Sequence, residues 1–288
     1  FNYRIMAGIG DNTSKVTKYD NPNRTLTDPY EGQQLGEIWG YVVDGYFKTD
    51  EEARNYKVDQ SFVNQMINAS ALDNGLHAGD LKFVDLDGNN KIEQTTSAND
   101  RKDMKVIGNS LPRYNYNFGI SADWYGIDFS VLFQGIGKQN WYPGAETSMF
   151  WGPYSRPYAS FIPSDFMSQV WSEENTDAYF PRPRGYVALG SNRELAVVNT
   201  KYLQNLAYCR LKNLSIGYTL PDKWLSKIGF EKIRVYFSGE NLLTFTKLHS
   251  DYIDPEQASA SNSWKTSKSD ANIYPWAKTY SFGVDITF

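Results

Sequence analysis

The chain has 288 residues, with 29 basic and 33 acidic side chains, two His and one Cys, and a formal net charge of −4. A single Cys excludes an internal disulfide framework, and one Cys with two His nearly excludes a four-ligand zinc site. The acidic balance argues against a nucleic-acid binder, which would show a basic face.

The sequence holds no run of about 18 consecutive apolar residues, so it predicts no transmembrane helix. Aromatic residues make up 16% of the chain while the mean hydropathy is −0.55. This combination suits a transmembrane barrel, whose strands alternate lipid-facing and lumen-facing residues, but also many secreted β-proteins. The chain starts at Phe1 without a signal peptide, so we expect it to be a processed product or part of a longer protein.

Alternation of apolar and polar residues, with a period of two, predicts strands along much of the chain. Residues 1–10 place Phe1, Tyr3 and Ile5 on one face. Residues 113–123 alternate over about eleven positions, enough for a tilted strand to cross a bilayer. A tight turn at 124–126 leads into the next strand, and the pattern slips at 208–212, which indicates a β-bulge. The six predicted strands lie near residues 1–10, 113–123, 126–137, 207–219, 231–243 and 279–288.

The connections between these strands alternate between short and long. Two are short, whereas the segments 11–111, 138–201 and 244–278 are long. Outer-membrane barrels typically have short periplasmic turns and long external loops. If the last strand runs toward the periplasm, all three long connections fall outside. The alternative is a soluble β-sandwich, although strands in globular proteins usually have only about five or six residues.

Six strings spread over nearly the whole chain resemble the C-terminal part of TonB-dependent outer-membrane transporters of the SusC/RagA type, found in Bacteroidetes. They are GQQLGEIWGYVVDGYFKTDEEA (32–53), GDLKFVDLDGNNKI (79–92), VIGNSLPRYNYNFGISADWYGIDFSVLFQG (106–135), VWSEENTDAYFPR (170–182), YCRLKNLSIGYTLP (208–221) and KIRVYFSGENLLTFTK (232–247). A match of any one string is a weak signal. Six matches in the same order as in the family are not explained by chance.

The resemblance implies an all-β fold: a partial transmembrane antiparallel β-barrel, formed by about the last six of roughly 22 strands, with long extracellular loops. The plug domain and the TonB box belong to the family's N-terminal portion and are expected to be absent here. The implied partners are the rest of the barrel and its plug, a SusD-like surface lipoprotein, the TonB complex, and an oligosaccharide or peptide cargo. The implied location is the outer membrane of a Gram-negative bacterium.

An EF-hand-like pattern begins at Asp85. Such loops place oxygen ligands at positions 1, 3, 5, 7 and 9, and an acid at position 12. The first five positions hold Asp85, Asp87, Asn89, Lys91 through its carbonyl, and Glu93. Position 12 is Thr96, and the Asp-Arg pair of the resembling family is displaced by an insertion near 95–98, so Asp100 is the expected last ligand, ahead of Asp103. The hypothesis is a structural Ca²⁺ site, and the alternative is a plain Asp/Asn turn.

Aromatic side chains are frequent in the connection 138–201. Sugars stack on such rings, and protein interfaces also favour Trp and Tyr. The candidates for substrate contact are Trp141, Tyr142, Trp151 and Tyr154, with Phe150, Tyr158 and Phe161 in the same segment. The alternative for each ring is packing within its loop or against a lipoprotein lid.

The carboxylates form no recognisable catalytic pair, and His77 and His249 stand in loops without a partner nucleophile, so we expect no enzyme. The leading prediction is TonB-dependent import of oligosaccharides or peptides, with this chain supplying barrel wall and external loops. The alternative is a secreted, soluble carbohydrate-binding β-domain with a calcium loop, and a glycoside hydrolase is more remote. By resemblance, the terminal strand with Tyr280, Phe282 and Phe288 is the barrel-assembly signal.

Overall fold

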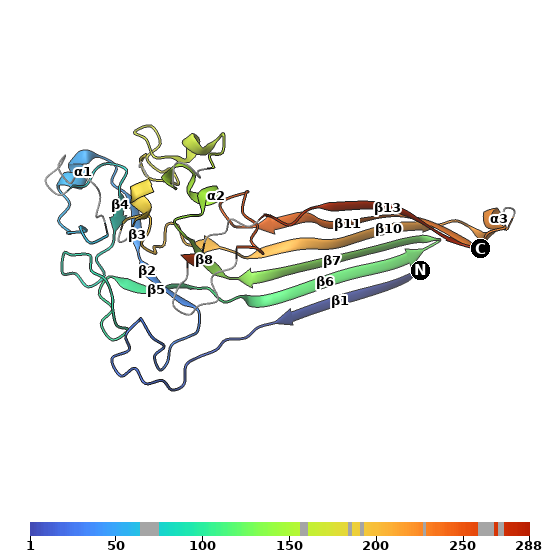
Figure 1. The fold of residues 1–288 in the computed structure, drawn as a ribbon, viewed down its shortest axis with the longest axis horizontal. Coiled ribbons are helices and arrows are strands. Elements are labelled where there is room, and N and C mark those ends of the chain that lie inside the picture. Colours follow the sequence, from blue (N-terminus) through green and yellow to red (C-terminus); the bar gives the residue numbers. More distant parts are fainter. Residues whose placement is uncertain are drawn as a thin grey trace.

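The computed structural model describes residues 1–63, 75–155, 161–183, 186–190, 193–226, 229–258, 268–269 and 274–288. Six long strands form one antiparallel sheet, the wall, in the order β1-β6-β7-β10-β11-β13. The wall extends from a folded region built by the long connections, so the molecule is elongated (Figure 1). Both chain termini lie at the tip of the wall, away from that region.

The wall strands closely follow the predicted alternation. They are β1 (Asn2–Gly10), β6 (Arg113–Trp124), β7 (Ile127–Lys138), β10 (Tyr208–Thr219), β11 (Lys232–Thr246) and β13 (Thr279–Thr287). β11 runs three residues beyond its expected end at 243, and the other strands begin and end within one residue of expectation. β6, β7 and β10 have 12 residues each, well beyond the about five or six of a typical globular strand.

The strand register places polar residues in one row across the wall and apolar residues in the next. One row consists of Arg4, Ser121, Ser130, Ser215, Ser238 and Ser281. The adjacent row consists of Tyr3, Ala122, Phe129, Ile216, Phe237 and Phe282. Since neighbouring residues of a strand point to opposite faces, the wall has one polar and one apolar face.

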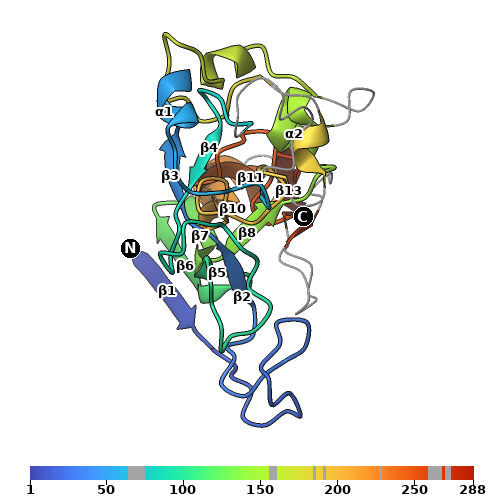
Figure 2. The same cartoon turned by 90° about the vertical axis from the view of Figure 1, so that its left-hand side faces the viewer.

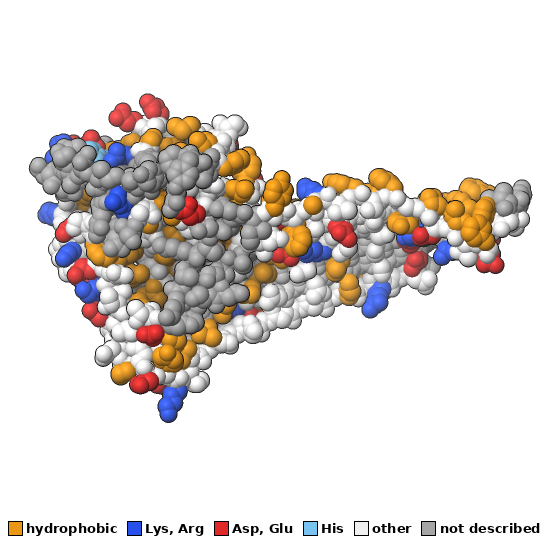
Figure 3. All heavy atoms as spheres, viewed as in Figure 1, with side chains coloured by type: hydrophobic (Ala, Val, Ile, Leu, Met, Phe, Trp, Pro, Cys, Tyr) orange, Lys and Arg blue, Asp and Glu red, His pale blue; other side chains and the backbone are white. Residues whose placement is uncertain are grey.

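The apolar face is open to its surroundings. Tyr3 is 67% exposed, Ile216 44% and Phe282 82%. The opposite face, turned to the viewer in Figure 3, is mostly uncharged with scattered charged side chains. Soluble monomers rarely expose so large an apolar surface. The predicted all-β class, with the six predicted strands in one antiparallel sheet, is confirmed.

The predicted slip in β10 is confirmed as a bulge. Pairing shifts between Leu211 and Asn213 against both neighbouring strands. The extra residue is Lys212, and both Lys212 and Arg210 reach the carboxylate of Glu256. The bulge therefore brings two cationic side chains close together on the polar face.

Two cross-strand Tyr–Gly pairs connect neighbouring strands of the wall. Tyr236 of β11 pairs with Gly283 of β13, and a Cβ at Gly283 would collide with the tyrosine ring. Tyr116 of β6 pairs with Gly135 of β7, where a Cβ would meet the Tyr116 ring. Here glycine permits close approach of the ring to the neighbouring backbone, a known means of supporting glycine in sheets.

The long connections fold into a compact head, defined here as the described residues of 11–112, 139–207 and 247–278. Its short sheets pair β2 (Glu37–Tyr41) with β5 (Met104–Asn109), β3 (Val43–Tyr46) with β4 (Leu81–Phe83), and β8 (Asn140–Pro143) with β9 (Gln204–Asn205) and β12 (Lys268–Ser269). Its helical turns are α1 (Asp50–Arg54), α2 (Ser148–Trp151), η1 (Gly152–Tyr154), η2 (Phe166–Gln169) and η3 (Tyr186–Leu189). Figure 2 looks onto the head along the wall.

The main hydrophobic core of the described chain lies in the head, and it includes Trp141, Trp151, Phe180 and Tyr202. A further turn, α3 (Asp222–Leu225), lies at the tip beside the termini (Figure 1). Among helices in the described ranges, none has the length and apolar character needed to span a membrane.

Candidate functional site

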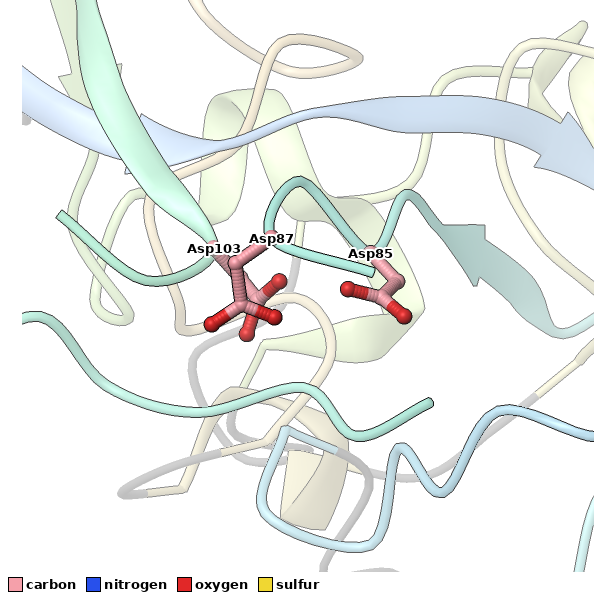
Figure 4. Close-up of side chains that lie close together, drawn as sticks. All are labelled: Asp85, Asp87 and Asp103. Atoms are coloured by element: carbon pink, nitrogen blue, oxygen red, sulfur yellow. The ribbon is translucent and has the colours of Figure 1, made fainter. Parts of the chain in front are cut away.

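Three carboxylates converge in the head between β4 and β5. Asp85 and Asp87 follow β4, and Asp103 directly precedes β5. One oxygen from each lies within 4.8 Å of the others (Figure 4). Asp85 and Asp87 are near neighbours in the sequence, so the return of the chain to Asp103 completes the cluster.

The turn 85–92 is organised by the Asp85 side chain. Its carboxylate accepts hydrogen bonds from the backbone N–H groups of Gly88 and Asn90, each at 2.7 Å. Asn90 has a φ of 63°, the left-handed geometry that position 6 of such a loop requires and that Asn tolerates. Ile92 is fully buried in the head core, so it anchors the end of the turn.

The closing carboxylate differs from expectation, because Asp103 and not Asp100 joins the cluster. The inserted segment turns away and binds residues 21–26: Leu26 N–H donates to Thr96 O, and Ala98 N–H donates to Arg24 O, both at 2.9 Å. Asp100 lies exposed in the turn where its N–H donates to Ser97 O. The chain returns only afterwards, so Asp103 takes the place assigned to Asp100.

The side chain of Asp103 is fully buried and fixed from two sides. Its oxygens accept from the backbone N–H groups of Leu86 at 2.9 Å and Glu93 at 2.7 Å. Burial and the neighbouring Asp87 and Asp85 carboxylates raise the pKa of Asp103. A raised pKa means that Asp103 resists ionisation beside the other two carboxylates, which a bound cation would relieve.

Two of the remaining predicted ligands, Asn89 and Glu93, contact the cluster. The Asn89 amide donates to Asp87 at 3.1 Å and to Glu93 at 3.2 Å. Lys102 lies 3.3 Å from Glu93, and this contact lowers the pKa of Glu93. Lys91 pairs with Asp59 through a backbone bridge. Three carboxylates with nearby amide and carbonyl oxygens form a hard donor set, which fits Ca²⁺ better than a metal that prefers nitrogen or sulfur.

The four aromatic residues expected to contact substrate are buried in the head core. Trp141, Tyr142 and Trp151 are 0% exposed and Tyr154 is 1% exposed. Their polar atoms are used internally: Trp151 Nε1 donates to Gly144 O at 3.0 Å and Tyr154 Oη donates to Pro181 O at 2.7 Å. The expectation of direct contact is therefore corrected to packing, because no ring face is open to a sugar.

Other aromatic residues of the same connection have different positions. Phe150 is also buried, whereas Phe161 is 38% exposed and packs edge-on against Tyr252 at 4.6 Å between ring centres. Tyr158 lies outside the described residues. Tyr252 belongs to the connection after β11, and its contact with Phe161 has no signal in the sequence because no local pattern links these two connections.

Charged residues on the polar face of the wall form ion pairs. Arg234 of β11 reaches Asp128 of β7 at 2.6 Å and Asp285 of β13 at 3.3 Å. The bridge to Asp128 passes over Gly217 of β10, where a Cβ would lie 2.5 Å from the Asp128 carboxylate. This arrangement links strands across the polar face.

A second ionic network joins the head to the wall. Arg210 of β10 is 2% exposed and contacts Asp254 at 2.6 Å and Glu256 at 2.7 Å. Asp254 also accepts from the backbone N–H of Trp276 at 3.1 Å. The connection after β11 is therefore fixed onto the polar face of the wall by buried charges.

The terminal strand presents its aromatic side chains on the apolar face. Tyr280 is 61% exposed and Phe282 and Phe288 are each 82% exposed. β13 pairs only with β11 within the described wall, so its other edge is open. These rings are accessible, and their role as a barrel-assembly signal stays a prediction.

Comparison with protein-family profiles gives no match to this chain. Among curated proteins, it is similar to TonB-dependent receptor P3 of Formosa agariphila, with 28% identity over 264 residues that cover 90% of this chain and 22% of the receptor. TonB-dependent receptor P39 of that organism shows 26% identity over 283 residues, covering 90% of this chain and 25% of the receptor. The chain therefore spans about a quarter of the length of these relatives.

Among solved structures, the chain resembles the RagAB peptide importer in its open-open state, with a TM-score of 0.60 and 19% identity, covering 100% of this chain and 27% of that one. A structure of the RagAB peptide transporter gives a TM-score of 0.56 at 18% identity, covering 99% and 27%. At this identity the likeness concerns the fold. The chain is thus related to the TonB-dependent receptors, over a segment about a quarter of their length, as its six sequence strings indicated.

Proposed function

We propose that this chain forms part of the barrel of a TonB-dependent outer-membrane importer. The observation that carries the proposal is the two-sided wall, with exposed apolar residues on one face and rows of Ser and charged residues on the other. A barrel in a bilayer needs this division because its outer face contacts lipid while its lumen is hydrated. The open edges at β1 and β13 would pair with the rest of the barrel, since unpaired edges do not persist in lipid.

In this proposal the head is extracellular and the tip with the short turns is periplasmic. The head would contact cargo and a SusD-like surface lipoprotein acting as a lid. The TonB complex would act through the part of the receptor outside this chain. The chain binds and passes cargo and performs no covalent chemistry.

We favour a peptide cargo over an oligosaccharide. The solved structures that resemble this chain are named as a peptide importer or transporter. The rings best placed in sequence to stack on sugars, such as Trp141 and Trp151, are buried in the head core. The described head keeps polar and charged groups at its surface, which suit the amides and charges of peptides.

We also propose that Ca²⁺ held by Asp85, Asp87 and Asp103 organises the loop between β4 and β5. The support is the convergence of these carboxylates and the raised pKa of Asp103. The bound ion would neutralise the carboxylates and hold the two ends of this loop together. Asn89, Glu93 and the Lys91 carbonyl are the adjacent oxygen donors.

Uptake by cells tests the transport proposal. A strain lacking the complete receptor gene is complemented with the intact gene or with one in which residues 139–207 are replaced by a short turn. We expect the intact receptor to restore energy-dependent uptake of a fluorescent peptide mixture, and the shortened receptor to assemble without restoring it. Uptake of labelled oligosaccharides instead of peptides would reverse the cargo assignment. Glycan binding by the isolated chain in detergent-free buffer would support the soluble alternative.

A further inference from the structure

A cavity of about 80 Å³ opens on the head, between segments that are far apart in the chain. Its walls come from α2, from residues 163–169 and from residues 249–252. The rim is held in place, because Ser250 Oγ donates to Met149 O at 2.7 Å and His249 Nε2 lies 2.8 Å from Gln169 Oε1. Hydrogen bonds between the three segments therefore fix the shape of the cavity.

The base of the cavity is aromatic. Phe150 and Phe166 are each 2% exposed and Phe180 is 1% exposed. Phe166 and Phe180 stack with ring centres 4.8 Å apart, and Phe150 meets Phe180 edge-on at 5.7 Å. A wall of ring faces and edges can hold an apolar stem, and ring faces also attract cations.

Two carboxylates give the rim of the cavity negative charge. Asp165 and Asp251 both line the cavity, and its lining includes no Lys or Arg. Within the described ranges, neither carboxylate forms an ion pair, and the Asp165 carboxylate accepts only a long hydrogen bond, from Gln169 at 3.4 Å. Both residues are exposed, so they are accessible to a ligand that enters from solvent.

The histidine at the rim does not offset this charge. His249 lies flat on Tyr179, with ring centres 3.5 Å apart. Desolvation of the ring lowers the pKa of His249 below its ordinary value of 6.5. The imidazole is therefore neutral near pH 7 and would not repel a cation.

We propose that this cavity is a subsite for a basic side chain of a peptide, with the alkyl stem against the phenylalanines and the cationic head between Asp165 and Asp251. The charge complementarity and the aromatic base both favour Lys or Arg over a neutral or acidic side chain. Tyr252 and Phe161 lie beside the entrance, where their exposed rings can cover the peptide backbone. The inference rests on the proposed peptide cargo and specifies which side chains that cargo carries.

The test uses the complete receptor, purified with any lipoprotein that accompanies it, and two peptides with blocked ends that differ only in Lys or norleucine at the central position. Calorimetry measures both affinities for the wild type, for Asp165→Asn, for Asp251→Asn and for the double variant. Glu173→Gln is the matched control, because it removes one exposed charge from the same head without touching the cavity.

We expect the wild type and Glu173→Gln to bind the lysine peptide about five- to tenfold more tightly than the norleucine peptide. Each Asp→Asn change should reduce this preference, and the double variant should abolish it while still binding the norleucine peptide. Equal binding of the two peptides by the wild type, or an unchanged preference in the double variant, would overturn the subsite. Failure of the wild type to bind either peptide would overturn the peptide cargo itself.

Discussion

Arg210 holds one connection of the head against the wall. Its guanidinium holds Asp254 and Glu256 of the connection after β11, while Arg210 and Asp254 are 2% and 5% exposed. Removing one partner of a buried pair leaves the other charge without compensation, which costs far more than losing an exposed pair.

Arg210→Met is expected to loosen residues 248–258 locally, at a cost of about 3 kcal/mol. Lys212→Met is the matched control, since its contact with Glu256 is partly exposed and worth about 1 kcal/mol or less. Hydrogen exchange of the complete receptor measures the protection of residues 248–258 in both variants. Equal protection of 248–258 in the two variants would show that the buried pair is not what holds this connection.

The carboxylate cluster gives a second prediction at this scale. Asp103→Asn should weaken calcium binding by about tenfold or more, because it removes one of three converging charges. Asp100→Asn removes the same charge from the exposed turn and should leave affinity unchanged. Calcium titration followed by calorimetry measures the affinity of each variant. Equal losses of calcium affinity in Asp103→Asn and Asp100→Asn would place the ion elsewhere.

The same site predicts a dependence on pH. Because the pKa of Asp103 is raised above 3.8, the contribution of Asp103 to the stability of the calcium-free loop is full at low pH and is lost as pH rises through the raised value. Calcium needs the ionised carboxylate, so its affinity should fall on acidification at a higher pH than for an ordinary Asp. Calcium titrations over a pH series measure this, and a flat profile would contradict it.

At the scale of elements, the wall could be predicted from the sequence and the head could not. Period-two alternation is local, so the strands and the bulge near Lys212 were located closely. Burial of Trp141 and Trp151 depends on contacts between connections that the sequence does not pair. The same holds for Asp103, whose position depends on the inserted segment binding residues 21–26.

The pairing of β11 with β13 depends on the fit of Tyr236 over Gly283. Gly283→Ala should force the ring aside and destabilise the terminal strand by about 1–3 kcal/mol, as overpacking does. Heat-modifiable gel migration of the complete receptor reports the loss of folded barrel. Adding Tyr236→Ala to Gly283→Ala should restore part of the folded, heat-modifiable form, because the collision between the ring and the new Cβ is removed. If the double variant is no better than Gly283→Ala, ring packing is not the cause.

At the scale of the whole molecule, the wall has two open edges and one exposed apolar face. The isolated 288-residue chain is therefore expected to require detergent and to associate with itself without it. Sedimentation and detergent phase partitioning measure this. A monomer in detergent-free buffer would contradict the barrel assignment and favour the soluble sandwich.

The position of both termini at the tip has a practical consequence for topology mapping. Asn2 pairs with Asp123 beside the turn at Gly126, and Lys232 pairs with Thr287 at the same end (Figure 1). An epitope tag after Phe288 and one inserted within 124–126 should thus be shielded together from antibodies applied to whole cells. A tag in the exposed turn at Asp100 should be stained. The receptor's sidedness can therefore be established by immunofluorescence alone.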